Sequence, residues 1–160
     1  MSILIIISHI LMFSSFIMLL VSVIQGHFFV TDGILKLQNF SIISILTYVF
    51  SQTFILFLII AINKEIKNLI TKNSVSINSK EYVKYKKKMH IHTSLNLLMI
   101  MTLAILFAAV HQEIIPLNIH RTFFVIVLVH YAYTIKIQYS CFKETIKLIV
   151  RLDDIIFTKL

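Results

Sequence analysis

The sequence predicts an all-α, polytopic membrane protein: a four-transmembrane-helix bundle with an amphipathic segment in its inner-face loop and a C-terminal amphipathic helix. Apolar residues make up 58% of the 160 residues and charged residues only 14%, too few to cover the surface of a water-soluble domain. The apolar residues also gather in uncharged runs, and about 20 residues of helix are enough to cross the hydrocarbon layer of a bilayer. At this length we expect one membrane domain, residues 1–160.

The first half of the chain predicts two spans and a basic loop. Residues 3–24 are almost continuously apolar, and we expect this span to be retained, because no basic start or small-residue cleavage pattern flanks it. Residues 41–63 predict the second span. Residues 64–89 then turn to Lys, Asn and Ser, and they predict a basic inner loop with a short amphipathic piece around Ile66 and Ile70.

The second half predicts two more spans. Residues 93–111 form the third, which closes before Pro116. The fourth, residues 121–142, depends on Lys136, because the uncharged run from Arg121 to Lys136 is only about 21 Å of helix. We expect the helix to cross with the Lys136 ammonium reaching back to the inner interface.

Lysine and arginine are distributed unevenly along the chain. Eight of the fifteen lie in residues 64–88 and five from Lys136 onward, whereas the other two connections hold only Lys36 and Arg121. From the positive-inside rule we expect the N-terminus outside and the C-terminus inside an energy-transducing or plasma membrane, with residues 143–160 as an amphipathic helix on the inner face. We expect no nucleic acid as partner, and contact with anionic lipid headgroups at Lys84, Lys86, Lys87 and Lys88.

Seven histidines in so apolar a chain are the main functional signal, because an ionisable group within a span is costly and usually faces a partner, a cavity or a cofactor. Measured from one outer boundary, His9 is about 9 Å deep and His130 about 13 Å deep. Two imidazoles at similar depth suit the axial positions of a b-type haem, so His9 and His130 are the predicted cofactor ligands. The alternative is structural, with each histidine bonded to a hydroxyl or carbonyl across the bundle. Residues expected to line the pocket or bind a quinone are Tyr48, Gln52, Tyr131 and Tyr133.

A second group of histidines falls at the predicted outer face. His27, His111 and His120 lie there with Asp32 and Glu113 in reach. Imidazole and carboxylate groups suit zinc or copper, so the three histidines are candidate metal ligands.

One histidine pattern resembles a known group of proteins. His92 opens one predicted span and His130 lies midway in the next, within HRTFFVIVLVHYAY. Over residues 85–140 this resembles small b-type cytochromes and haem–copper oxidase assembly proteins. The resemblance assigns no role to an individual residue.

Three functions fit these observations. The first is a small membrane subunit of a larger respiratory or other electron-transfer complex, which holds a b-type haem or lines a quinone site. The second is a purely structural accessory subunit or assembly factor, in contact with other membrane subunits and without a cofactor. The third is a small transporter or channel, which the lack of any acidic residue within a span disfavours. No hydrolase or nucleotide-binding motif occurs to indicate a catalytic activity.

Overall fold

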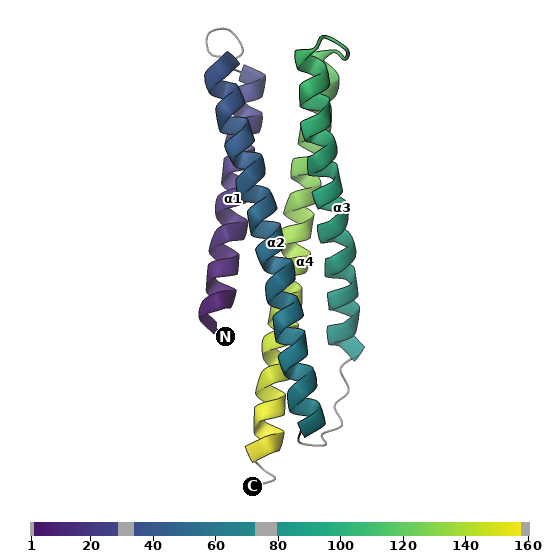
Figure 1. Ribbon diagram of the computed structural model, residues 1–160. Helices are drawn as coiled ribbons and strands as arrows, with labels where there is room; N and C mark the ends of the chain where they lie inside the picture. The colour runs from purple at the N-terminus through teal and green to yellow at the C-terminus, as the bar shows by residue number, and fades with distance from the viewer. Residues whose placement is uncertain (1, 29–33, 73–79, 158–160) are drawn as a thin grey trace.

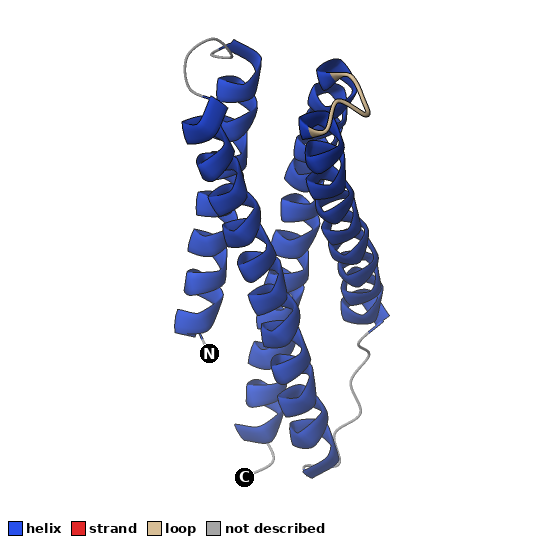
Figure 2. Ribbon diagram, turned by 45° about the horizontal axis from the view of Figure 1, so that its top comes forward, coloured by secondary structure: helices blue, strands red, loops and turns tan. Residues whose placement is uncertain are grey.

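The computed structural model describes residues 2–28, 34–72 and 80–157, which are helical apart from a short turn. The helices are α1 (Ser2–Phe28), α2 (Ile34–Lys72), α3 (Lys80–His111) and α4 (Leu117–Phe157). They form two antiparallel hairpins that lie side by side, α1 with α2 and α3 with α4 (Figures 1 and 2), and α1 also packs against α4. The predicted all-helical bundle is confirmed. "Lower end" below means the end where α1 begins and α4 ends, and "upper end" the end with the α3–α4 turn (Figure 1).

Three of the helices are long and apolar enough to cross a membrane. The segments are Ile3–Gln25 in α1, Ile42–Thr71 in α2 and Tyr82–His111 in α3. They indicate a membrane-embedded protein. α4 does not meet the same condition within the described residues, since polar side chains such as Lys136 and Gln138 interrupt its apolar run.

Each helix buries one stripe of side chains that recurs at alternating spacings of three and four residues. This heptad spacing is the seam of helices packed nearly parallel in a coiled-coil-like bundle. In α1 the buried stripe is Ile5, Ser8, Met12, Ser15, Leu19 and Ser22. In α4 it is Phe124, Val127, Tyr131, Thr134, Gln138, Cys141, Thr145, Leu148 and Leu152. Every second position of the α1 stripe is serine, and small residues let helix backbones approach closely in a membrane.

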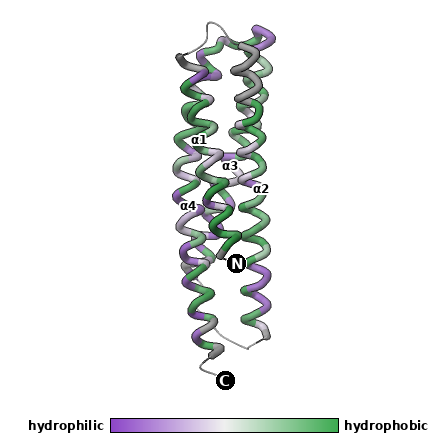
Figure 3. The backbone as a smooth tube through the Cα atoms, turned by 90° about the vertical axis from the view of Figure 1, so that its left-hand side faces the viewer, coloured by the Kyte–Doolittle hydropathy of each residue, from purple (hydrophilic) through white to green (hydrophobic). Residues whose placement is uncertain are grey.

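The helices extend further at the lower end than the predicted spans do. The sequence predicted a loop over 64–89 and a separate amphipathic helix over 143–160. In the structure α2 continues to Lys72, α3 begins at Lys80 and α4 runs unbroken to Phe157. Residues 73–79 and 158–160 of those predictions lie outside the described residues. Figure 3 shows hydrophilic stretches towards the lower ends of α2 and α4, where the helices nevertheless continue.

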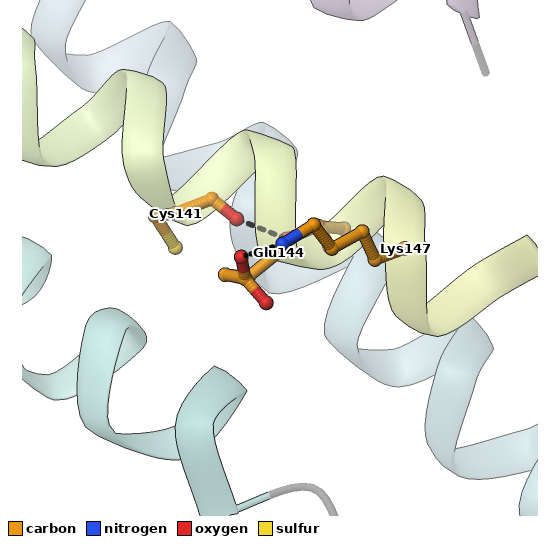
Figure 4. Close-up of polar contacts among 4 residues, drawn as sticks. Cys141, Glu144 and Lys147 are labelled. Atoms are coloured by element: carbon orange, nitrogen blue, oxygen red, sulfur yellow. Dashed lines mark hydrogen bonds and ion pairs between the residues drawn. The ribbon is translucent and has the colours of Figure 1, made fainter. Parts of the chain in front are cut away.

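Packing explains why the helices do not stop where the apolar runs do. Lys and Glu are good helix formers, so their appearance ends an apolar span but not a helix. Ile66 of α2, Tyr82 of α3 and Leu148 and Leu152 of α4 are buried in one apolar cluster at the lower end. The outer surface carries charged side chains, and there the ammonium of Lys147 lies 2.6 Å from a carboxylate oxygen of Glu144 (Figure 4). We call residues 64–72, 80–89 and 143–157 the lower extension.

The two ends of the described chain lie at the same end of the bundle. α1 begins towards the lower end, above the level at which α4 ends (Figure 1). The predicted placement, with the N-terminus outside and the C-terminus inside, does not fit this arrangement. An even number of antiparallel helices returns the chain to the end at which it started.

The α3–α4 turn at the upper end is a Schellman motif. The amide of Ile114 donates to the carbonyl of Ala109 at 2.9 Å, and the amide of Glu113 donates to that of Val110 at 3.0 Å. Glu113 has a φ of 59°, in the left-handed region that glycine adopts at lower cost. Pro116 follows and precedes the first residue of α4.

Candidate functional site

A buried polar network lies in the middle of the bundle, and Tyr131 of α4 is its centre. The Tyr131 hydroxyl lies 2.6 Å from Oγ of Ser15 on α1 and 3.3 Å from the carbonyl of Met12. It also accepts a hydrogen bond of 3.0 Å from Nε2 of Gln52 on α2. Ser15, Gln52 and Tyr131 are fully buried, so these bonds form away from lipid and water. One hydroxyl therefore connects three helices.

Gln138 of α4 extends the network to α3, the one helix that Tyr131 does not reach. Its Nε2 donates to Oε1 of Gln52 at 2.6 Å and to Oγ1 of Thr93 on α3 at 3.0 Å. Polar side chains that bond across helices hold membrane bundles together, because lipid offers them no other partner. The chain of bonds from Ser15 to Thr93 consequently links all four helices.

A second chain of bonds ends at a pair of histidines between α3 and α4. The Tyr48 hydroxyl donates to Oδ1 of Asn96, and Asn96 Nδ2 lies 2.8 Å from Nδ1 of His130. His130 Nε2 in turn lies 3.4 Å from Nδ1 of His92. Tyr48 also packs edge-on against Tyr131, with ring centroids 4.7 Å apart. The pair is thus joined to the central network through Tyr48.

The direction of these bonds fixes where the histidine protons lie. An amide Nδ2 only donates, so His130 Nδ1 accepts, and in a neutral imidazole the proton is then on Nε2. His130 Nε2–H therefore donates to His92 Nδ1, and neutral His92 carries its own proton on Nε2. Both rings are half-buried.

On the outer side of the pair lies Tyr133, which is 44% exposed. Its ring stands edge-on to that of His92 at 5.1 Å, and Nζ of Lys88 lies 5.4 Å from its centroid. Tyr133 is the only one of the four predicted pocket residues that lies outside the buried set, since Tyr48, Gln52 and Tyr131 are fully buried.

The predicted haem ligands His9 and His130 are not brought together. His9 Nδ1 donates to the carbonyl of Ile5 at 2.7 Å, and its ring packs against Tyr139 and Phe142 at centroid distances of 5.6 and 5.4 Å. Tyr139 lies nine residues beyond His130 in α4, about 14 Å further down the helix. The predicted equality of depth assumed that both helices enter from the same boundary, whereas α1 enters from the lower end and α4 from the upper end.

The predicted metal ligands are also separate where they are described. His111 is exposed at the end of α3, and His120 packs between Phe107 and Phe124 at 5.7 and 6.0 Å. The side chain of His27 lies outside the described residues. Among the side chains that are described, no three His, Cys, Asp or Glu come together as a metal site.

Four residues that complete the network were not predicted from the sequence. Ser15, Thr93, Asn96 and Gln138 each recur at heptad spacing with apolar core residues of their own helix. An amide side chain within an apolar span is itself a signal, because lipid cannot satisfy it. Comparison with protein-family models, with curated proteins and with solved structures gave no match.

Proposed function

We propose that the protein is a small membrane subunit whose four helices all cross the bilayer and which serves as a scaffold within a larger membrane complex. The observation that carries this proposal is the buried hydrogen-bond network from Ser15 to Thr93, which ties every helix to its neighbours. A bundle held together in this way folds as one unit and offers its outer surface to lipid and to other subunits.

The length of α4 supports a fourth crossing. From Leu117, which begins α4 at the upper end, to Lys136 is about 28 Å of helix, close to the ~30 Å of the hydrocarbon layer. Lys136 then lies at the lower boundary and needs no deep burial. Both ring nitrogens of His130 and Nε2 of Gln138 bond to side chains of other helices, which keeps these polar groups from lipid.

Apolar side chains outside the proposed membrane region support a partner. Ile146 and Val150 are 45% and 53% exposed on α4, and they lie four residues apart on one face of the lower extension. Exposed apolar residues that cluster on a polar surface often mark a contact with another protein. We propose that the lower extension contacts another subunit there, and that it lies inside together with both ends of the chain, because most Lys and Arg are at this end.

Co-purification in mild detergent tests the scaffold role. We expect a stoichiometric partner with the wild-type protein, and loss of that partner when Ile146→Asn and Val150→Asn are combined. Lys143→Asn, an exposed change on the same extension, is the matched control and should keep the partner. Purification of the wild type as a lone chain, or equal retention by the double variant and the control, would refute the proposal. An absorption spectrum of the assembly tests whether the complex is of the electron-transfer type.

Tryptophan fluorescence tests the fourth crossing, because the chain has no tryptophan of its own. Val129 is 66% exposed within the proposed span of α4, and Val150 is exposed in the lower extension. In vesicles with lipids brominated near the bilayer centre, Val129→Trp should be quenched strongly and Val150→Trp weakly. Equal quenching at the two positions would contradict a crossing by α4.

A further inference from the structure

A group of cationic and hydrogen-bond-donating side chains gathers on the outer face of α3 and α4, where these two helices lie side by side (Figure 1). Lys88 and His92 of α3 both contact the ring of Tyr133 on α4. Lys136 lies three residues after Tyr133, and residues at this spacing are neighbours on a helix surface. Lys88, Tyr133 and Lys136 are exposed and His92 is half-buried. We call these four residues the cationic face.

The histidine pair leaves one donor on this face. His92 Nδ1 lies 3.4 Å from Nε2 of His130, and it accepts the hydrogen bond because Asn96 fixes the tautomer of His130. The proton of neutral His92 is therefore on Nε2, at the opposite side of the ring from His130. That N–H is available for an acceptor from outside the bundle.

The two lysines of the cationic face have no carboxylate partner among the described residues. Glu144, whose carboxylate pairs with Lys147, lies two turns further along α4. Two ammonium groups and an imidazole N–H without a neighbouring acid favour an anion with several acceptor oxygens. A phosphate group has this chemistry.

The position of the cationic face along the bundle matches that of a lipid phosphate. Lys88 lies about 34 Å along α3 from His111 at the upper end, and Lys136 about 28 Å along α4 from Leu117. If the upper ends of these helices lie at one membrane boundary, both lysines lie near the other, about 30 Å away. Apolar side chains flank the face on its upper side, with Leu95 46% and Val129 66% exposed.

We propose that the cationic face binds the phosphodiester of an anionic phospholipid. The ammonium groups of Lys88 and Lys136 and the Nε2–H of His92 donate to its phosphate oxygens, and its acyl chains lie along Leu95 and Val129. A lipid fits better than soluble phosphate, because the donors adjoin apolar surface that acyl chains cover. The proposal uses the membrane placement of α3 and α4 but does not require a partner subunit, so it fails or holds independently of the scaffold role.

Native mass spectrometry of the full chain in detergent, with added phosphatidylglycerol or phosphatidylcholine, tests this site. We expect the first phosphatidylglycerol to bind about tenfold more tightly than phosphatidylcholine, and this preference to be lost when Lys88→Gln and Lys136→Gln are combined. The control is Lys64→Gln with Lys67→Gln, which removes the same charge from exposed positions on α2 and should keep the preference within about twofold. His92→Phe keeps an aromatic ring but no N–H, and should weaken phosphatidylglycerol binding several-fold.

Two results would overturn the proposal. If the α2 control loses as much preference as the Lys88 and Lys136 variant, the attraction comes from the overall charge of the lower end and not from this face. If millimolar inorganic phosphate displaces the bound phosphatidylglycerol, the site recognises soluble phosphate rather than a lipid. Circular dichroism of each variant shows whether it keeps the wild-type helicity, so that a loss of binding is read only from folded protein.

Discussion

Replacement of Tyr131 by phenylalanine removes one hydroxyl from the middle of the bundle and keeps the aromatic ring. That hydroxyl has three neighbours, Ser15 Oγ at 2.6 Å, Gln52 Nε2 at 3.0 Å and the Met12 carbonyl at 3.3 Å. Ser15 keeps its own bond to Met12, but Gln52 Nε2 loses an acceptor in a fully buried position. Each interhelical hydrogen bond in a membrane contributes about 0.6 kcal/mol on average and up to ~1.7, and an orphaned buried donor costs about 1–3 kcal/mol. We expect Tyr131→Phe to lower the free energy of unfolding by about 2 kcal/mol.

Equilibrium unfolding in mixed detergent micelles, followed by circular dichroism, measures this loss. Tyr139→Phe is the matched control on the same helix, because its side chain is 56% exposed and should change stability by less than about 0.5 kcal/mol. If Tyr131→Phe lowers the free energy of unfolding no more than Tyr139→Phe does, the network does not stabilise the bundle and does not support a preassembled scaffold. A double-mutant cycle with Gln52→Leu should further show coupling of about 1 kcal/mol, since the two residues share one bond.

Three further predictions concern the ends of the bundle. Leu152→Ala should lower the free energy of unfolding by about 3 kcal/mol, because Leu152 is fully buried in the lower extension. Val150→Ala, at an exposed position, should lower it by less than about 0.5 kcal/mol. Equal losses in thermal unfolding would mean that the end of α4 does not pack on the bundle. Glu113→Gly should raise the free energy of unfolding by about 1 kcal/mol, because glycine takes the positive φ of 59° without steric cost, and a loss of stability would contradict the Schellman geometry. In a background without the native cysteine, His111→Cys should react with an impermeant thiol reagent only from outside and Lys67→Cys only from inside, and reaction of both from one side would contradict the crossing of the intervening helix.

The sequence predicted the helices well where a long apolar run marks a membrane span. Three uncharged runs marked the apolar segments of α1, α2 and α3, because only a helix satisfies its own backbone in lipid. The sequence predicted the ends of the helices poorly. Lys64 ends an apolar run, yet Ile66 two residues later is buried in the apolar cluster at the lower end, and a hydropathy pattern does not show that a helix continues beyond its apolar run.

The candidate site could be predicted only in part, because pairing depends on which helix faces which. The sequence identified His130 as a buried ionisable residue and Tyr48, Gln52 and Tyr131 as interior residues. It paired His130 with His9 by depth, but the structure pairs it with His92. Contact partners on a neighbouring helix follow from the heptad stripes of both helices and from their antiparallel register. Neither is visible in a hydropathy average, since polar and apolar residues share each stripe.

The direction in which each helix runs accounts for several of these differences together. Because α1 runs from the lower end upwards and α4 from the upper end downwards, His9 lies near Tyr139 and not near His130. The same direction brings Tyr133 of α4 against Lys88 of α3, and Lys136 follows Tyr133 by one helical turn towards the lower end, where the basic residues of α2 and α3 also lie. Lys136 was the main objection to a fourth span when it was considered within α4 alone. In the proposed lipid site, Lys136 would instead set the depth of α4, because an ammonium that binds a lipid phosphate holds its helix at the boundary of the bilayer.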